Sequence, residues 1–321
     1  MNKSLSVSRI KLLISLAASW VIVLWAAPAQ SQVEVITSIK PLQLIVQEIV
    51  GQRFSVGVVV GSAGSPHDYS LRISDIEKIK LADLVVWVGP HLENFLVKPV
   101  QKYARHSLIV GNLPGVRISA EEHQHGERDS HDEAELNIDE DLLRLDPHIW
   151  LDPIYAKKII EITSLKLIEL DPSAAQLYRA NAEKFTTRLD DLDRNIRSKL
   201  SNSRDKGFYV FHDGYGYFVE RYQLRQLGSF KFSPETSLSV RQLTVVKEAI
   251  DEKKVSCIFQ EPQYNGQFIE ELHKNSGVRI AALDPLAMDI LVEPGGYINF
   301  LQKFSTTIYQ CLNDEEQTGK R

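Results

Sequence analysis

The chain has 321 residues, of which 25% are charged, and carries a formal net charge of −5 at pH 7. This length exceeds what one hydrophobic core usually organises, so two domains are expected. A moderately acidic chain without a Lys/Arg cluster argues against binding to nucleic acid.

Residues 1–29 have the layout of a secretory signal peptide. Lys3, Arg9 and Lys11 make a basic start, an apolar stretch follows over 12–25, and 27–29 reads Ala-Pro-Ala, the small residues of a cleavage site. The alternative is an uncleaved membrane anchor, because the apolar stretch is nearly long enough to span a bilayer. We expect cleavage and export to the periplasm.

Apolar strands alternate with helical segments along the rest of the chain. The predicted strands are 33–39, 54–60, 84–89, 108–111, 207–211, 255–260 and 278–283. The predicted helices are 41–50, 70–80, 215–222, 240–253, 268–275 and 297–312. Such alternation predicts an α/β fold of two lobes, residues 30–172 and 203–321, each a mainly parallel sheet flanked by helices.

A long helix is predicted between the lobes, over residues 173–202. Its apolar positions step by three and four, at Tyr178, Ala182, Phe185, Leu189, Leu192, Ile196 and Leu200. Asp171 is a candidate cap, and Pro172 suits a first turn. At 1.5 Å per residue the helix measures roughly 40 Å, so we expect it to run along both lobes and to limit hinge motion. The alternative is an ordinary long helix inside one domain.

Residues 121–145 do not read as folded. The segment is rich in Asp and Glu, holds His123, His125 and His131, and has few apolar side chains. Such a composition does not bury enough surface to order itself, so we expect a flexible loop. Its histidines suggest weak secondary metal binding, and a plain acidic solvated loop is the alternative.

The chain has two cysteines, Cys257 in a predicted strand and Cys311 near the end of the last predicted helix. Export to an oxidising compartment makes a disulfide the default, and two buried free thiols are the alternative. In either state their role is structural, since no further cysteine is present to build a thiolate metal site.

Histidines stand in three separate sequence islands, each at the end of an apolar segment. The islands are Ser-Pro-His67-Asp-Tyr, Asp-Pro-His148-Ile-Trp and Val-Phe-His212-Asp-Gly. Ligands of open α/β sheets bind beyond the carboxyl ends of the strands, which would bring the three rings into the cleft between the lobes. A lone histidine is usually structural, and His91, His106 and His273 are interpreted in that way. Three converging imidazoles instead predict a metal site.

Asp284 follows the last predicted strand and is the candidate fourth ligand, with water as the alternative. Three imidazoles with one oxygen make a tetrahedral Zn²⁺ site, whereas Mn²⁺ prefers more oxygen donors. The residue types therefore favour zinc, although Cu²⁺ and Ni²⁺ also suit such a site.

Several long motifs resemble, in the same order, those of the zinc-uptake solute-binding proteins of ABC transporters (the ZnuA type, among the cluster A-I metal-binding proteins). They are Pro-His67-Asp-Tyr-Ser-Leu-Arg, Ala-Asp-Leu-Val-Val-Trp-Val-Gly-Pro at 82–90, His148-Ile-Trp-Leu-Asp-Pro, Phe-His212-Asp-Gly-Tyr-Gly-Tyr-Phe and Leu-Asp284-Pro-Leu. The likeness covers nearly the whole exported chain.

The resemblance implies a periplasmic monomer without enzymatic activity. Such a protein captures Zn²⁺ between two α/β lobes and delivers it to a membrane ABC permease with its cytoplasmic ATPase. Manganese and iron relatives have Glu where this chain has His212, so the resemblance also favours zinc. Some zinc members have Glu where this chain has Pro66, which leaves the fourth ligand to Asp284 or water.

Two other functions are compatible with a zinc site. A secreted zinc hydrolase also uses three protein ligands and an open position, but the chain has no His-Glu-x-x-His motif and no Gly-x-Ser-x-Gly motif. A zinc-storage or adhesion protein is the other alternative, and growth under zinc starvation distinguishes it from an importer component.

Overall fold

The computed structural model describes residues 33–61, 64–114, 146–231, 240–263, 272–274 and 276–313. The predicted signal peptide and the acidic segment 121–145 lie outside these residues, and so does most of the helix predicted over 268–275. Among the described helices, none is both long and apolar enough to cross a bilayer.

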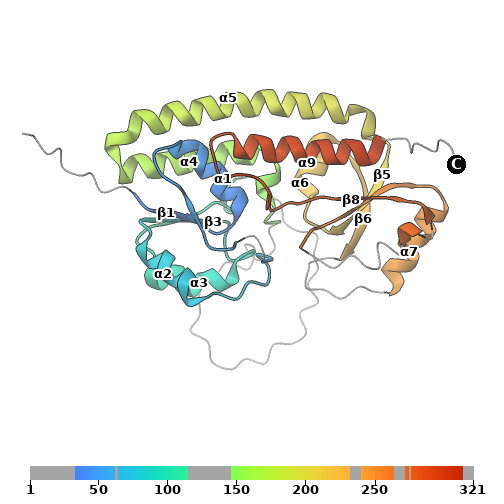
Figure 1. Ribbon diagram of the computed structural model, residues 1–321, viewed down its shortest axis with the longest axis horizontal. Helices are drawn as coiled ribbons and strands as arrows, with labels where there is room; N and C mark the ends of the chain where they lie inside the picture. The colour runs from blue at the N-terminus through green and yellow to red at the C-terminus, as the bar shows by residue number, and fades with distance from the viewer. Residues whose placement is uncertain are drawn as a thin grey trace, which may run out of the picture. The chain divides into compact units, whose positions relative to one another are not determined.

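The described strands form two parallel sheets of four strands each. The first has the order β2-β1-β3-β4, with β1 Val35–Thr37, β2 Gly57–Val58, β3 Leu84–Trp87 and β4 Ser107–Ile109. The second has the order β6-β5-β7-β8, with β5 Gly207–His212, β6 Arg225–Lys231, β7 Val255–Gln260 and β8 Arg279–Ala282. All six pairings are parallel. This confirms the predicted fold class (Figure 1).

Helices connect and cover the strands. The α-helices are α1 Lys40–Val50, α2 Ile73–Leu81, α3 Val97–Tyr103, α4 Pro153–Leu170, α5 Ala175–Leu200, α6 Gly216–Tyr222, α7 Val240–Asp251 and α9 Gly296–Asn313. Short 3-10 turns lie at Asn94–Leu96, Ile149–Leu151, Pro172–Ala174 and Ser201–Ser203. Every residue of the central strands β3 and β5 is buried, as expected where helices cover both faces of a parallel sheet.

Helix α5 contacts elements of both halves of the chain (Figure 1). Near its start, Asn181 Nδ2 donates to the Ile49 carbonyl of α1 over 2.9 Å. Near its end, Lys199 Nζ donates to Thr306 Oγ1 of α9 over 2.8 Å. A helix of 26 residues measures about 39 Å, which allows this reach. The long helix that joins the two sheets is therefore confirmed.

In the described part of the chain, the buried apolar side chains form one large cluster and one small one. The large cluster runs from the first sheet through α1, α4, α5 and α9 to the inner face of the second sheet, where it includes Phe208 and Val210. The alternate side chains of the same strand, Tyr209 and Phe211, belong to the small cluster on the outer face. Because the large core crosses between the halves, they are packed together and not only tethered.

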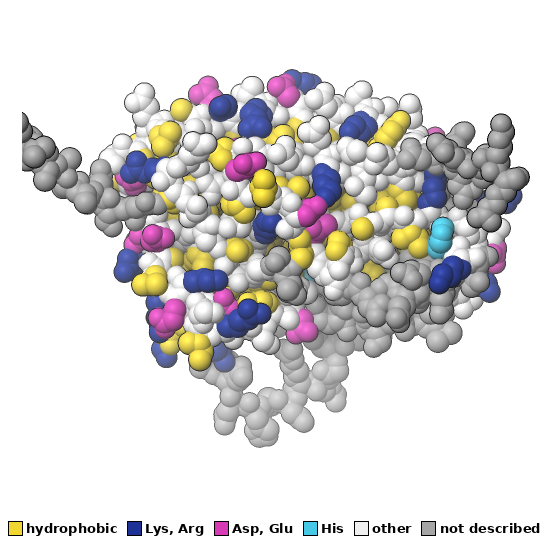
Figure 2. Space-filling model, in the orientation of Figure 1, with side chains coloured by type: hydrophobic (Ala, Val, Ile, Leu, Met, Phe, Trp, Pro, Cys, Tyr) yellow, Lys and Arg dark blue, Asp and Glu magenta, His cyan; other side chains and the backbone are white. Residues whose placement is uncertain are grey.

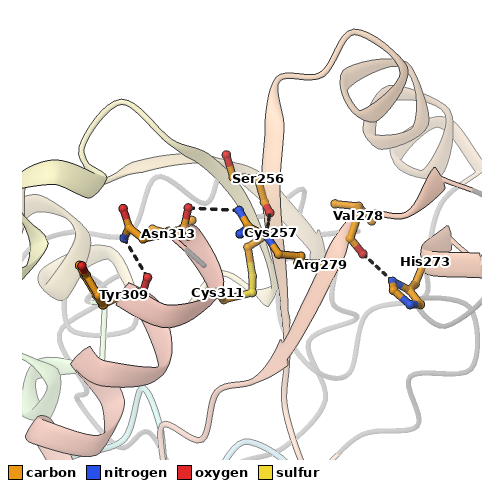
Figure 3. Close-up of a disulfide and its surroundings, with 9 residues drawn as sticks. Ser256, Cys257, His273, Val278, Arg279, Tyr309, Cys311 and Asn313 are labelled. Carbon is orange, nitrogen blue, oxygen red and sulfur yellow. Dashed lines mark hydrogen bonds between the residues drawn. A yellow bond between two sulfur atoms is a disulfide. The ribbon is translucent and has the colours of Figure 1, made fainter. Parts of the chain in front are cut away.

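A disulfide joins Cys257 of β7 to Cys311 of α9, with their Cα atoms 5.8 Å apart (Figure 3). Arg279 of β8 lies beside it and donates to the carbonyls of Ser256 and Leu312, each over 3.1 Å. The bridge and these hydrogen bonds attach the last helix to the second sheet.

Charges of both signs are scattered over the surface drawn in Figure 2. Lys and Arg side chains lie interspersed with Asp and Glu among apolar and uncharged groups. Over the coloured part of this face, neither sign gathers into an extended patch.

Candidate metal centre

His212 is the last residue of β5 and is only 3% exposed. Its Nδ1 is hydrogen-bonded to the carboxylate of Glu261, which directly follows β7. Because β5 and β7 are parallel neighbours, their carboxyl ends lie together, and this places the carboxylate beside the ring. Tyr215 Oη also donates to Glu261 Oε1, over 2.9 Å. Glu261 is therefore held from two sides while it orients His212.

His148 directly precedes the 3-10 turn that leads into α4, and it is 5% exposed. Asp146 Oδ1 contacts this residue twice, at 3.1 Å from the backbone nitrogen and at 2.9 Å from ring Nδ1. The ring also packs against Trp150, with centroids 5.2 Å apart. Both buried imidazoles thus have a carboxylate on Nδ1, and their Nε2 atoms face each other.

His67 lies in the loop between β2 and α2 and is half-buried. Its backbone N–H donates to Ser65 Oγ over 3.2 Å. Burial, followed by the neighbouring imidazoles of His148 and His212, lowers the pKa of His67 well below its ordinary value of 6.5. The ring is therefore neutral at pH 7, which is the form that binds metals.

The three histidine rings converge on one point. His148 Nε2 lies 3.4 Å from His67 Nε2 and 3.3 Å from His212 Nε2. One ligand atom from each of the three residues lies within 4.8 Å of the others. In a tetrahedral zinc site with bonds of 2.0–2.1 Å, ligand nitrogens stand about 3.3 Å apart. The two Nε2–Nε2 spacings in the structure match that edge length.

The hydrogen bonds on Nδ1 indicate why a cation suits this point. A carboxylate only accepts, so Asp146 and Glu261 place the proton of each neutral ring on Nδ1. The Nε2 atoms of His148 and His212 then present lone pairs to each other at 3.3 Å. Two facing lone pairs repel each other unless a positive charge lies between them. The buried pair is therefore prepared for a metal ion or a proton.

Gly214 supplies the space that the rings need. A Cβ atom at this position would lie 2.4 Å from His212 Nε2 and 2.9 Å from His148 Nε2. Real Cβ contacts are essentially never shorter than 3.0 Å. Any side chain at 214 would therefore press on the two nitrogens that face the candidate ion.

Asp284 is placed differently from the histidines and is not part of their group. Its carboxylate accepts hydrogen bonds from the backbone nitrogens of Leu286 (2.9 Å) and Met288 (2.6 Å). Gln263 Nε2 donates a third, over 2.8 Å. In the structure this carboxylate thus organises the turn after β8. Its role as a metal ligand stays a prediction.

The remaining described histidines also stand apart from the group. His106 is exposed, and His273 Nδ1 is 2.7 Å from the Val278 carbonyl (Figure 3). Both ring nitrogens of His91 are buried without a hydrogen-bond partner among the described residues. Burial, with His148 nearby, lowers the pKa of His91 to about 4. The loop histidines at 123, 125 and 131 lie outside the described residues.

Residues 35–311 match the family model described as "Zinc-uptake complex component A periplasmic". The chain belongs to this family. Two similar relatives are each named "High-affinity zinc uptake system protein ZnuA". The one from Haemophilus influenzae is 33% identical and covers 90% of this chain and 96% of its own length. The one from Yersinia pestis is 35% identical and covers 87% and 91%.

Solved structures share the family fold. AdcAII of Streptococcus pneumoniae is 26% identical, with a TM-score of 0.71 over 87% of this chain and 98% of its own. A ZnuA deletion mutant with zinc bound has a TM-score of 0.72 over 88% and 99%, at 23% identity. At 23% identity, the similarity to the ZnuA deletion mutant supports only a shared fold.

The sequence predictions for this site overlooked the two carboxylates that orient it. Asp146 and Glu261 were not singled out, although a signal was present for each. Glu261 follows a buried strand directly, and Asp146 stands two positions before His148. Two aspartates beside the histidines have other partners instead. Asp152 caps α4 by accepting from the Ile154 nitrogen over 2.7 Å, and Asp213 accepts from Gln226 over 2.9 Å.

Proposed function

We propose that this chain captures Zn²⁺ in the periplasm and delivers it to a membrane ABC importer, with the ion bound by His67, His148 and His212. The observation that carries the proposal is the spacing of the Nε2 atoms, 3.3 and 3.4 Å, which fits a tetrahedral zinc ion. Family membership supports the transport role, since the relatives are named as zinc uptake proteins.

The fourth ligand is water or Asp284, and the hydrogen bonds of Asp284 favour water. Three donors at 2.6–2.9 Å hold its carboxylate within its own turn. To bind the ion, the carboxylate would have to move and give up part of this bonding. A water ligand requires no such change and leaves one position that a receiving site can use for exchange.

The arrangement of charges favours binding over hydrolysis. A zinc hydrolase needs a general base beside the metal-bound water. Asp146 and Glu261, the carboxylates nearest to the rings, are already bonded to imidazole Nδ1 atoms. In that position they orient the ligands from the Nδ1 side of each ring, opposite to the converging Nε2 atoms.

Equilibrium dialysis with metal analysis tests zinc capture. We expect one tightly bound Zn²⁺ per chain, and a large loss of affinity in His67→Ala. The matched control is His106→Ala, since His106 is exposed and stands outside the histidine group. Weak, sub-stoichiometric binding that His67→Ala leaves unchanged would refute zinc capture.

Growth under zinc starvation tests delivery. A strain lacking this protein should grow poorly in chelator-treated medium and recover with the wild-type gene, whereas the His67→Ala gene should fail to restore growth. Normal growth of the deletion strain would instead favour storage or adhesion.

A further inference from the structure

Arg221 joins α6 to α5 and to the start of α4, the helix that follows the His148 segment. Its guanidinium donates twice to Asp193 of α5, from Nε over 2.8 Å and from Nη2 over 2.6 Å. Nη1 lies 3.4 Å from Asp152 Oδ1, at the start of α4. The Arg221 side chain is only 11% exposed, so these charges interact with little screening by solvent. The bidentate geometry fixes direction as well as distance.

The same helix holds the other end of the segment that carries His148. Tyr217, one turn before Arg221, donates from its hydroxyl to the Asp146 carbonyl over 3.1 Å. Its ring also packs edge-to-face on Tyr155 of α4, with centroids 5.2 Å apart. Residues 146–152, with His148 among them, are thus held at both ends by α6.

Helix α6 is also the direct continuation of the strand that carries His212. Only three residues separate His212 from Gly216, where α6 begins. The segments that carry His148 and His212 are therefore both attached to α6, although the two residues lie far apart in the sequence. The backbone of the His67 loop is instead held by local hydrogen bonds, such as those from the His67 N–H to Ser65 and from Tyr69 to Asp75.

We propose that Tyr217 and Arg221, which we call the α6 clamp, are positioning residues that set the distance between His148 and His212 before the metal arrives. The inference rests on the proposed zinc binding. A pair of ligands that is already placed loses less conformational freedom on binding, so the clamp raises affinity without touching the ion. Through Asp193 it also connects the site to the long helix α5.

The ion pair between Arg221 and Asp152 is largely buried, so removing it also affects stability. Arg221→Met keeps most of the side-chain bulk but removes the nearest cation from Asp193 and Asp152, which destabilises a fold in its own right. The matched control is therefore Arg53→Met. Arg53 pairs with Asp171 over 3.0 Å, and the Asp171 side chain, at 4% exposure, is more buried than those of Asp152 and Asp193, at 12% and 15%. Among the described residues, the hydrogen bonds and ion pairs of Arg53 and Asp171 involve neither the three histidines nor α6.

The test measures the zinc dissociation constant by competition with a chromophoric chelator, together with the melting temperature of each metal-free variant. We expect Arg221→Met to raise the zinc Kd by about 10- to 100-fold, the usual loss when groups that orient metal ligands are removed. Arg53→Met should lower the melting temperature while its Kd stays at the wild-type value. Arg221→Lys should restore part of the affinity.

A wild-type Kd in folded Arg221→Met would overturn the proposal, and so would equal Kd losses in Arg221→Met and Arg53→Met. If Arg221→Met does not fold, Tyr217→Phe decides, since it removes one hydroxyl and keeps the ion pair. A raised Kd then supports the clamp, and an unchanged Kd overturns it. Wild-type protein in the same titration reports on the proposed function separately, because weak binding there refutes zinc capture itself.

Discussion

Replacing Gly214 by alanine tests how closely the candidate centre is fitted to one small ion. The new Cβ would stand 2.4 Å from His212 Nε2, and ordinary contact begins at 3.4 Å. The ring would therefore have to retreat by about 1 Å, whereas metal–ligand distances tolerate only about 0.2 Å. His212 is buried and bonded to Glu261 at Nδ1, so it cannot retreat freely. We therefore expect Gly214→Ala to lose His212 as one of its three imidazole ligands.

We expect Gly214→Ala to raise the zinc Kd by about 100-fold, which corresponds to about 2.8 kcal/mol. Competition against a chromophoric chelator measures the Kd, and circular dichroism checks that the fold is kept. Gly61→Ala is the matched control, because a Cβ there meets none of the described residues within 4 Å. A wild-type Kd in folded Gly214→Ala would show that the ion does not bind between these rings.

Three further predictions concern the groups around the centre. Asp146→Asn and Glu261→Gln replace the charged acceptor at Nδ1 by a neutral amide with only one acceptor oxygen, so each should weaken zinc binding by about 10- to 100-fold in the same competition assay. Wild-type affinity in both would contradict the orienting role. The metal-free protein should melt at lower temperature as pH falls below about 6.5, because the unfolded chain takes up a proton at His67 while the lowered pKa keeps the folded ring neutral. His67→Asn should lose less over that range, and an equal loss would argue against this origin. Replacing both Cys257 and Cys311 by alanine opens a bridge with a sequence separation of 54 and should lower the free energy of unfolding by about 4 kcal/mol, measured by urea titration. Zinc affinity should then stay near wild type, and its loss in a folded variant would link the bridge to the site.

Much of the fold was predictable because the central strands are strongly apolar. Strands β3 and β5 are buried on both faces and were expected from their composition. Strand β6 was missed because its sequence, Arg-Gln-Leu-Gly-Ser-Phe-Lys, has neither an apolar run nor a regular alternation. Its strand conformation depends on pairing with β5, which a local pattern does not reveal. Strand β2 is shorter than predicted for a related reason, since only Gly57 and Val58 pair with β1.

The residues of the site could be predicted only in part, because some of them are brought together by long-range contacts. The strand-end rule predicted that His67, His148 and His212 converge, and the structure brings them together. The same rule was applied to Asp284 but not to Glu261, although both follow strands of the second sheet. What distinguishes them is strand order: β7 lies next to β5, whereas β8 lies one strand further away. That order comes from tertiary pairing and cannot be read from spacing.

Asp171 shows how tertiary contacts also override a local rule. It was a candidate cap for the long helix, and no side-chain cap bond is found there. Its carboxylate instead accepts from Ser173, Tyr178 and Arg53, at 2.6, 3.0 and 3.0 Å. Arg53 comes from a distant part of the chain and draws the side chain into an ion pair.

The central claim is that three imidazoles from distant parts of the chain hold a single zinc ion. Anomalous diffraction from zinc-loaded crystals, recorded on both sides of the zinc absorption edge, tests it most directly. We expect one strong peak at about 2.0–2.1 Å from the Nε2 atoms of His67, His148 and His212. A peak that lies elsewhere, or that leaves one of these rings out of bonding range, would contradict the account.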